Sequence, residues 1–286
     1  MKKIITMILM IIFIPMLFIG CENSKEDDGK LKVAVSVNTL REFTENIGKD
    51  KVNIYTVVKE NMEPHDFDFT PADKKELTNR EILIYNGLGL EPWIDQVEGD
   101  IELIDASKGV DVIQTEGADD PHVWLSLKEA MVQCKNIKDI LVKKDPDNKE
   151  YYEENYEKYI SEMESLYNEY KPQFDSVNKK NFVTSHEAFA YLCREYGLEQ
   201  KAIKGVLNED VETTFKDMTA LADYCKEQGI NVIFSEGSES QKDADTLAKA
   251  IEGKVIPIYT LETKVEGKSY LEAMKDNYEK IYGALK

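Results

Sequence analysis

The chain has 286 residues, with 36 Lys and Arg against 55 Asp and Glu, and a formal net charge of -19. This excess of carboxylate excludes a protein that binds the nucleic-acid backbone, and it favours a cationic ligand over an anionic one. The length allows two domains that each bury a core, and the 42% apolar content is normal for a globular protein.

Residues 1–20 have the pattern of a secretion signal. Two lysines precede an apolar run that ends just before Cys21 and is short for a membrane span of about 20 residues. The ending Phe-Ile-Gly-Cys resembles a bacterial lipobox, so we expect Cys21 to be the lipid-modified first residue of the mature protein. An uncleaved anchor helix is the alternative. Either arrangement places the chain on the outer face of the cytoplasmic membrane, with residues 21–30 as a flexible tether.

Cys134, Cys193 and Cys225 remain after the predicted cleavage site. They form no C-x-x-C pair and have no neighbouring histidine, which excludes zinc-finger and thioredoxin-type motifs. Each lies in an amphipathic helical stretch, so we expect buried free thiols. The sequence leaves open whether two of them form a disulfide.

Residues 31–144 alternate between β-rich runs and helical patterns. The runs predict strands over 31–37, 52–58, 82–87 and 101–105, and the helical patterns begin near residues 40, 74 and 126. Alternation of this kind is typical of parallel strands with crossover helices. Residues 31–144 are therefore predicted to form an N-terminal α/β lobe.

Residues 145–178 contain the most periodic part of the chain. Apolar and aromatic residues recur there at steps of three and four, which predicts one long helix with a single apolar stripe. The members of this stripe are Tyr152, Tyr156, Tyr159, Met163, Leu166, Tyr170, Phe174 and Val177. We interpret the tyrosines as core residues with hydroxyls at the rim, and we expect Pro172 to kink or end the helix.

The alternation resumes in residues 179–286. Strands are predicted over 181–185, 201–206, 231–236 and 254–259, with helices between them and a closing helix over 270–285. The whole chain is therefore predicted to be an α/β protein of two βα lobes with parallel sheets, joined by one long rigid helix.

The chain has three histidines, and each stands where a predicted strand gives way to a loop or a helix. His65 follows the VNIYTVV run, His122 lies in DPHVWLS, and His186 lies in TSHEAFAYL. Because ligands gather at the carboxyl ends of strands in open parallel sheets, we expect the three rings to meet between the lobes. Asp66 and Asp120 stand near enough to orient rings as hydrogen-bond acceptors.

Three imidazoles are a zinc-type ligand set, and tetrahedral zinc takes a fourth ligand. Two carboxylates follow predicted strands in the second half of the chain, Glu262 in YTLET and Glu236 in FSEGSES. Spacing alone does not choose between them.

Five segments resemble, in order, the landmarks of the zinc- and manganese-binding receptor lipoproteins of bacterial ABC importers, the solute-binding protein family 9 type. They are EPHDFDFTP, DPHVWLS, TSHEAFAYL, FSEGSES and YTLET. The resemblance covers nearly the whole chain. It implies that His65 and His122 are the ligands of the N-terminal lobe, that His186 and Glu262 are those of the C-terminal lobe, and that Glu236 is a structural carboxylate beside the site.

The resemblance also implies a divalent metal as cargo, a membrane permease as partner, and a small closure of the lobes around a rigid helix. We expect zinc, with manganese as the alternative, because manganese members place a carboxylate where His186 stands. The VIQTEGADDPH segment departs from many zinc members, which carry a His-rich loop there. We further expect a monomer that is held at the membrane only by its lipid.

Two other classes of protein compete with a metal receptor. A secreted zinc hydrolase needs an open coordination position and a general base. The H-E-x-x-H motif of many such enzymes is absent, because Ala190 stands where the second histidine is required. An adhesin or purely structural surface lipoprotein is the third class, in which the histidines are incidental. The chain is predicted not to be an enzyme.

Overall fold

The computed structural model describes residues 29–115, 118–205, 213–236 and 241–286. The predicted signal peptide, Cys21 and most of the predicted tether lie outside these ranges. None of the helices in the described ranges combines the length and the apolar character that a membrane crossing requires.

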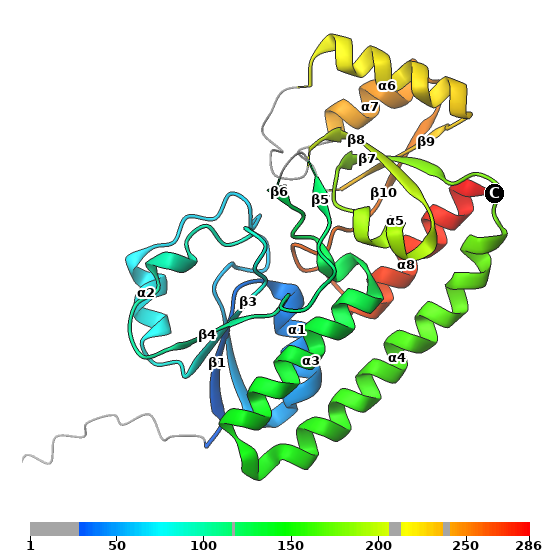
Figure 1. Ribbon diagram of the computed structural model, residues 1–286. Helices are drawn as coiled ribbons and strands as arrows, with labels where there is room; N and C mark the ends of the chain where they lie inside the picture. Colours follow the sequence, from blue (N-terminus) through cyan, green and yellow to red (C-terminus); the bar gives the residue numbers. More distant parts are fainter. Residues whose placement is uncertain (1–28, 116–117, 206–212, 237–240) are drawn as a thin grey trace, which may run out of the picture.

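The described residues form two four-stranded parallel sheets, one in each half of the chain (Figure 1). The first has the order β2-β1-β3-β4 and the second the order β10-β9-β7-β8. The strands of the first sheet are β1 (Leu31–Val35), β2 (Val52–Thr56), β3 (Ile82–Tyr85) and β4 (Glu102–Asp105). Those of the second are β7 (Asn181–His186), β8 (Glu199–Lys204), β9 (Val232–Ser235) and β10 (Lys254–Pro257). The predicted α/β architecture with two parallel sheets is confirmed.

Helices follow the strands, as the alternation of patterns predicts. They are α1 (Asn38–Gly48), α2 (Pro71–Leu77), α3 (Leu127–Lys144), α4 (Lys149–Ser176), α5 (Ala190–Tyr196), α6 (Phe215–Gln228), α7 (Gln241–Ala250) and α8 (Tyr270–Leu285). A small antiparallel hairpin, β5 (Gln114–Thr115) with β6 (Ala118–Asp119), was not predicted. Strands of two residues carry no detectable alternation, so the sequence pattern gives no sign of them.

The long helix α4 runs beside both lobes in Figure 1. Most of its predicted stripe is core, because Tyr152, Met163 and Phe174 are fully buried, whereas Tyr156 is partly buried against that core. Pro172 lies inside the helix, which continues to Ser176. Of the two expected outcomes, an end of the helix at Pro172 is therefore wrong, whereas a kink there stays a prediction. Pro172 lacks one N–H donor, and the apolar packing of buried side chains on both sides of it outweighs that loss.

A continuous apolar core passes from the first sheet through α1, α3, α4 and α8 to the inner face of the second sheet. In β7, Phe182 belongs to this main core, whereas the next residue, Val183, belongs to a smaller core beneath α6 and α7. Neighbouring strand residues point to opposite faces, so helices cover both faces of the second sheet. A core shared by the two lobes favours small relative motion between them.

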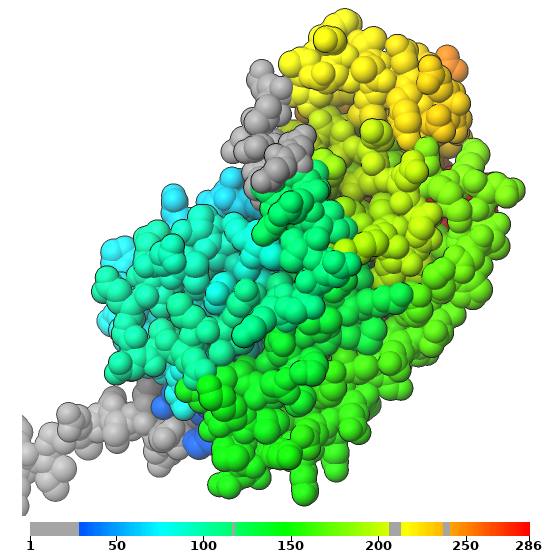
Figure 2. Space-filling model, in the orientation of Figure 1, coloured from blue at the N-terminus to red at the C-terminus, as the bar shows by residue number. Residues whose placement is uncertain are grey.

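The lobes also meet at the surface, where atoms of both form a continuous face in Figure 2. Arg194 of α5 pairs with Glu129 of α3 at 2.5 Å and with Asp111 at 3.1 Å. The three described cysteines, Cys134, Cys193 and Cys225, are buried and free, as predicted.

Candidate metal site

Four side chains that are distant in sequence converge between the lobes. His65 Nε2 lies 3.4 Å from His122 Nε2 and 3.1 Å from Glu262 Oε1. His122 Nε2 lies 3.0 Å from Glu262 Oε1 and 3.2 Å from His186 Nε2. Among the described residues, these four form a group whose ligand atoms all lie within 4.8 Å of one another. Four ligands at 2.0 to 2.1 Å from zinc in a tetrahedron are about 3.3 Å apart, so the cluster has the size of a zinc shell.

Each member of the cluster stands on a loop or at the end of an element. His65 lies on the loop between β2 and α2, and His122 immediately precedes the short 3₁₀ helix η3 (Val123–Leu125). His186 is the last residue of β7, and Glu262 lies on the loop between β10 and α8. Of the three histidines, His186 stands at the carboxyl end of a parallel strand, as predicted. His65 lies well beyond the end of β2, and His122 follows the antiparallel strand β6, so loops bring these two rings to the cluster.

Burial differs among the four. The side chains of His122 and Glu262 are 0% and 1% exposed, and His186 is also buried, whereas that of His65 is 10% exposed. His65 is thus the member of the cluster that solvent reaches.

Asp120 orients the ring of His122. One oxygen of its fully buried carboxylate, Oδ1, accepts hydrogen bonds from His122 Nδ1 at 2.8 Å and from the His122 backbone N–H at 2.9 Å. Occupying Nδ1 in this way leaves Nε2 to face the cluster. Asp66 has no such role, because it is exposed and the hydrogen bonds of the His65 ring run to His122 and Glu262.

Glu236 lies outside the four-residue group. It follows β9, and its backbone N–H donates a hydrogen bond to Ser185 Oγ at 3.3 Å, next to His186. Of the two carboxylates between which spacing does not choose, the structure therefore brings Glu262 to the histidines.

Burial and the charges of neighbouring side chains determine the pKa values of the residues in the cluster. Burial lowers the pKa of His122, but hydrogen bonds to Asp120 and Glu262 outweigh it and raise the pKa to about 10. Burial raises the pKa of Glu262, and its bonds to His122 and His65 bring it well below the usual value. Burial and the positive charge of His122 lower the pKa of His186 to about 3. At neutral pH these shifts favour a positively charged His122 and a neutral His186 in the metal-free cluster.

Two residues that the sequence does not mark as functional, Tyr191 and Asn86, support the loop of His122. The hydroxyl of Tyr191 donates to the Asp120 carbonyl at 2.8 Å and accepts the Ile113 N–H at 3.1 Å. Asn86 Nδ2 donates to the Pro121 carbonyl at 2.9 Å. These hydrogen bonds are made to the backbone of the loop. They therefore require no particular side chain or spacing in the loop that could be recognised in the sequence.

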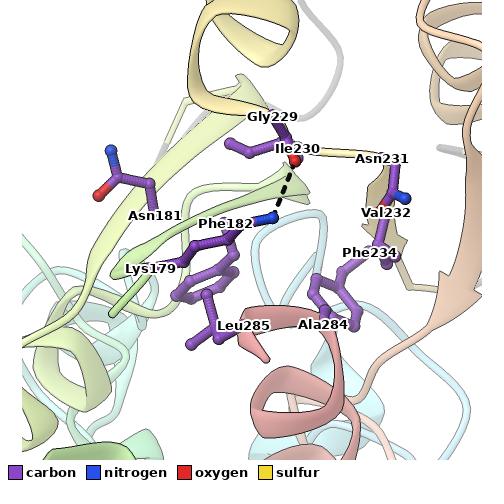
Figure 3. A pocket seen from close by; sticks show the side chains of 10 residues that line it. All are labelled: Lys179, Asn181, Phe182, Gly229, Ile230, Asn231, Val232, Phe234, Ala284 and Leu285. Carbon is purple, nitrogen blue, oxygen red and sulfur yellow. Dashed lines mark hydrogen bonds between the residues drawn. The ribbon is translucent and has the colours of Figure 1, made fainter. Parts of the chain in front are cut away.

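A crevice at the opposite end of the second sheet is not connected with this cluster. It is lined by residues near the first positions of β7 and β9 and by the end of α8, as Figure 3 shows. Lys179 Nζ donates across it to the Gly229 carbonyl at 3.3 Å. Its volume of about 10 Å³ leaves room for one water at most.

Two α/β lobes on a common core, with three imidazoles and one carboxylate between them, define a class of two-lobed metal-ion-binding proteins. The model of the zinc-uptake complex component A (periplasmic) family, ZnuA, matches residues 33–284. The chain belongs to this family, and the resemblance noted in the sequence is confirmed.

Named relatives cover nearly all of the chain. A high-affinity zinc uptake system protein of Bacillus subtilis (strain 168) is 36% identical over 291 residues, 93% of this chain and 90% of the relative. A manganese ABC transporter substrate-binding lipoprotein of Streptococcus pneumoniae is 31% identical over 307 residues, 98% of each chain.

A solved structure with the same fold is the laminin-binding protein of Streptococcus agalactiae, described as a bifunctional protein with adhesin and metal transporting activity. It has a TM-score of 0.86 and 27% identity, and the match covers 90% of this chain and 100% of that one. The relatives agree on metal transport and differ in the metal that their names state.

Proposed function

We propose that this chain is the extracytoplasmic receptor of a metal ABC importer, which captures zinc with His65, His122, His186 and Glu262 and delivers it to the membrane permease. The observation that carries this proposal is the convergence of three Nε2 atoms and one carboxylate oxygen within 4.8 Å. Membership of a family of zinc-uptake components supports it.

Zinc is favoured over manganese by the chemistry of the donors. Manganese suits carboxylate, carbonyl and water oxygens, whereas zinc binds imidazole well and accepts four ligands in a tetrahedron. The cluster offers three nitrogens and one carboxylate. Similarity by itself does not choose, because relatives named for zinc and for manganese both match the chain.

A carrier fits this set of donors better than a zinc hydrolase does. A hydrolytic zinc site keeps one position open for water, with three protein ligands. Four protein donors at tetrahedral spacing fill the shell of the ion, which suits capture and release of the ion itself.

We further propose that Cys21 carries a lipid that holds a monomeric receptor at the outer face of the cytoplasmic membrane. The names of several relatives include the word lipoprotein, which supports this placement. Mass spectrometry of the protein from its native membrane tests it. A diacylglyceryl group on Cys21 is expected, and an intact N-terminus at Met1 would contradict the lipid anchor.

The experiment that tests the metal assignment is a metal-bound crystal structure with anomalous scattering at the zinc edge, from protein produced with zinc and manganese both present. We expect one zinc per chain, with nitrogen distances of about 2.0 to 2.1 Å. Manganese at the site would overturn the choice of metal. Three protein ligands with a bound water would favour the hydrolase.

A further inference from the structure

Glu262 follows a strand of the second sheet, but the segment 260–270 that carries it is hydrogen-bonded to the first lobe. Five hydrogen bonds make this connection: Trp124 Nε1 to the Thr260 carbonyl (2.7 Å), Thr39 Oγ1 to the Leu261 carbonyl (2.5 Å), the Lys264 N–H to the Glu60 carbonyl (2.9 Å), the Tyr270 N–H to Glu42 Oε1 (2.6 Å), and the Tyr270 hydroxyl to the Trp124 carbonyl (2.5 Å). The segment is therefore attached to elements far from it in sequence.

Two of these bonds hold the peptide groups immediately before Glu262, and both are buried. Between them lies Leu261, whose φ of +65° falls in the left-handed region that residues with a side chain rarely adopt. Such a conformation persists only where the surroundings impose it. The bonds from Thr39 and Trp124 are contacts of this kind, so they set the direction in which Glu262 points.

Trp124 also connects Glu262 to His122. It stands two residues after His122, and the two rings meet edge to face with centroids 5.5 Å apart. Its indole N–H and its own carbonyl both bond to the segment of Glu262. His122 and Glu262 thus share one rigid support.

His186 is supported differently. Its carbonyl accepts hydrogen bonds from Thr184 Oγ1 at 2.6 Å and from Gln200 Nε2 at 2.8 Å, and both donors belong to strands of the second sheet. Its backbone is therefore held within the second lobe.

We propose that Trp124 and Thr39 are positioning residues that fasten Glu262 to the first lobe. His65, His122 and Glu262 then form a preassembled half-site of three ligands, and His186 is the ligand that the second lobe adds. This inference rests on the proposed metal-binding function and specifies how its site is divided. Metal enters the half-site first and is locked in place by His186, so any relative movement of the lobes breaks one ligand contact and keeps three.

Two substitutions test the positioning role, with a matched control. Trp124→Phe keeps an aromatic ring against His122 and removes the indole donor, and Thr39→Val removes the hydroxyl with little change of shape. The control is Thr44→Val, on the same helix, because within the described residues the buried Thr44 hydroxyl bonds to that helix alone, at the Leu40 carbonyl. By competition with a chromophoric chelator, we expect about tenfold weaker zinc binding for the first two variants, as is usual for outer partners of a ligand, and less than about twofold change for the control.

A double-mutant cycle separates positioning from general structure. In a Glu262→Ala background the effect of Trp124→Phe or Thr39→Val on zinc affinity is expected to vanish, whereas in a His186→Ala background it is expected to remain about tenfold. Equal effects in the two backgrounds, or no effect of either substitution alone, would overturn the inference. Absence of zinc binding by the unsubstituted protein would instead reject the proposed function. Thermal unfolding of each metal-free variant verifies folding, and Thr39→Val carries the test if Trp124→Phe does not fold.

Discussion

His186 ends one strand of the second sheet and Glu262 follows another, yet different parts of the molecule support them. The backbone of His186 is bonded to Thr184 and Gln200 of its own sheet, whereas the turn before Glu262 is bonded to Trp124 and Thr39 of the first lobe. The order of residues along the chain therefore does not show to which lobe a ligand is attached. The hydrogen bonds of the backbone beside the ligand show this attachment.

The same contrast appears in the ionisation of the cluster. On the first-lobe side, His122 holds a proton between the carboxylates of Asp120 and Glu262. On the second-lobe side, His186 stays neutral because burial and the charge on His122 lower its pKa. A divalent cation at the proposed site would thus displace a proton from His122 and meet a neutral imidazole at His186.

The largest expected effect is that of zinc itself, because at the proposed site zinc would join His186 to the other three ligands. A ligand that binds only the folded state stabilises it by RT ln(1 + [L]/Kd), about 4 kcal/mol at a thousandfold excess over Kd. We expect the melting temperature of chelator-stripped protein to rise by about 10 °C with zinc in calorimetry. An unchanged melting temperature would contradict both the receptor function and the division of its site.

The next effect distinguishes the two carboxylates. Glu262→Ala removes a donor of the half-site and is expected to weaken zinc binding by at least about 100-fold, measured by competition with a chelator. Glu236→Ala is the matched control, because Glu236 lies near His186 but outside the four-residue group. It should change zinc affinity by less than about threefold. The reverse ranking in well-folded variants would make Glu236 the fourth ligand.

The pH dependence probes the first-lobe side of the comparison. The pKa of His122 is raised in the folded state. The protonated ring therefore adds its full contribution to the free energy of unfolding below about pH 6.5, and this contribution is lost as the pH rises toward about 10. The free energy of unfolding of metal-free protein should fall by up to about 2 kcal/mol from pH 7 to 8.5 in chemical denaturation. Zinc affinity should rise over the same range, because binding must displace this proton and its displacement becomes less costly as the pH rises toward the pKa.

The measurement stops at pH 8.5 because the buried thiols would add a second effect above it. Burial raises the pKa of Cys134, Cys193 and Cys225, so their ionisation at higher pH would also lower the free energy of unfolding. Asp120→Asn provides the control, since it removes one of the two carboxylates that hold the proton on His122 and should flatten the dependence. A dependence of equal slope in this variant would show that another group titrates.

The smallest effect concerns the second-lobe side. His186→Glu replaces an imidazole with the oxygen donor that a harder ion prefers, so zinc affinity should fall more than manganese affinity, by about tenfold in the ratio of the two. Calorimetric titration of wild type and variant with each metal measures this ratio. A ratio that stays constant would show that His186 does not determine the choice between the metals.

Much of the fold was predictable because its signals are local. Alternation of β-rich runs and helical patterns revealed both sheets, and steps of three and four revealed α4 with its buried Tyr152 and Phe174. The outcome at Pro172 was not predictable in the same way. The cost of a proline is a local quantity, whereas the packing that outweighs it comes from other parts of the chain.

For the candidate site, the sequence by itself indicated the three histidines and the two carboxylates that compete to join them. Only the tertiary structure decided that Glu262 meets the rings, that Asp120 rather than Asp66 orients one of them, and that Trp124 and Thr39 hold the turn. The two bonds to that turn join residues 136 and 222 positions apart. Periodicity and spacing describe neighbours along the chain, and contacts over such separations exist only once the lobes have packed.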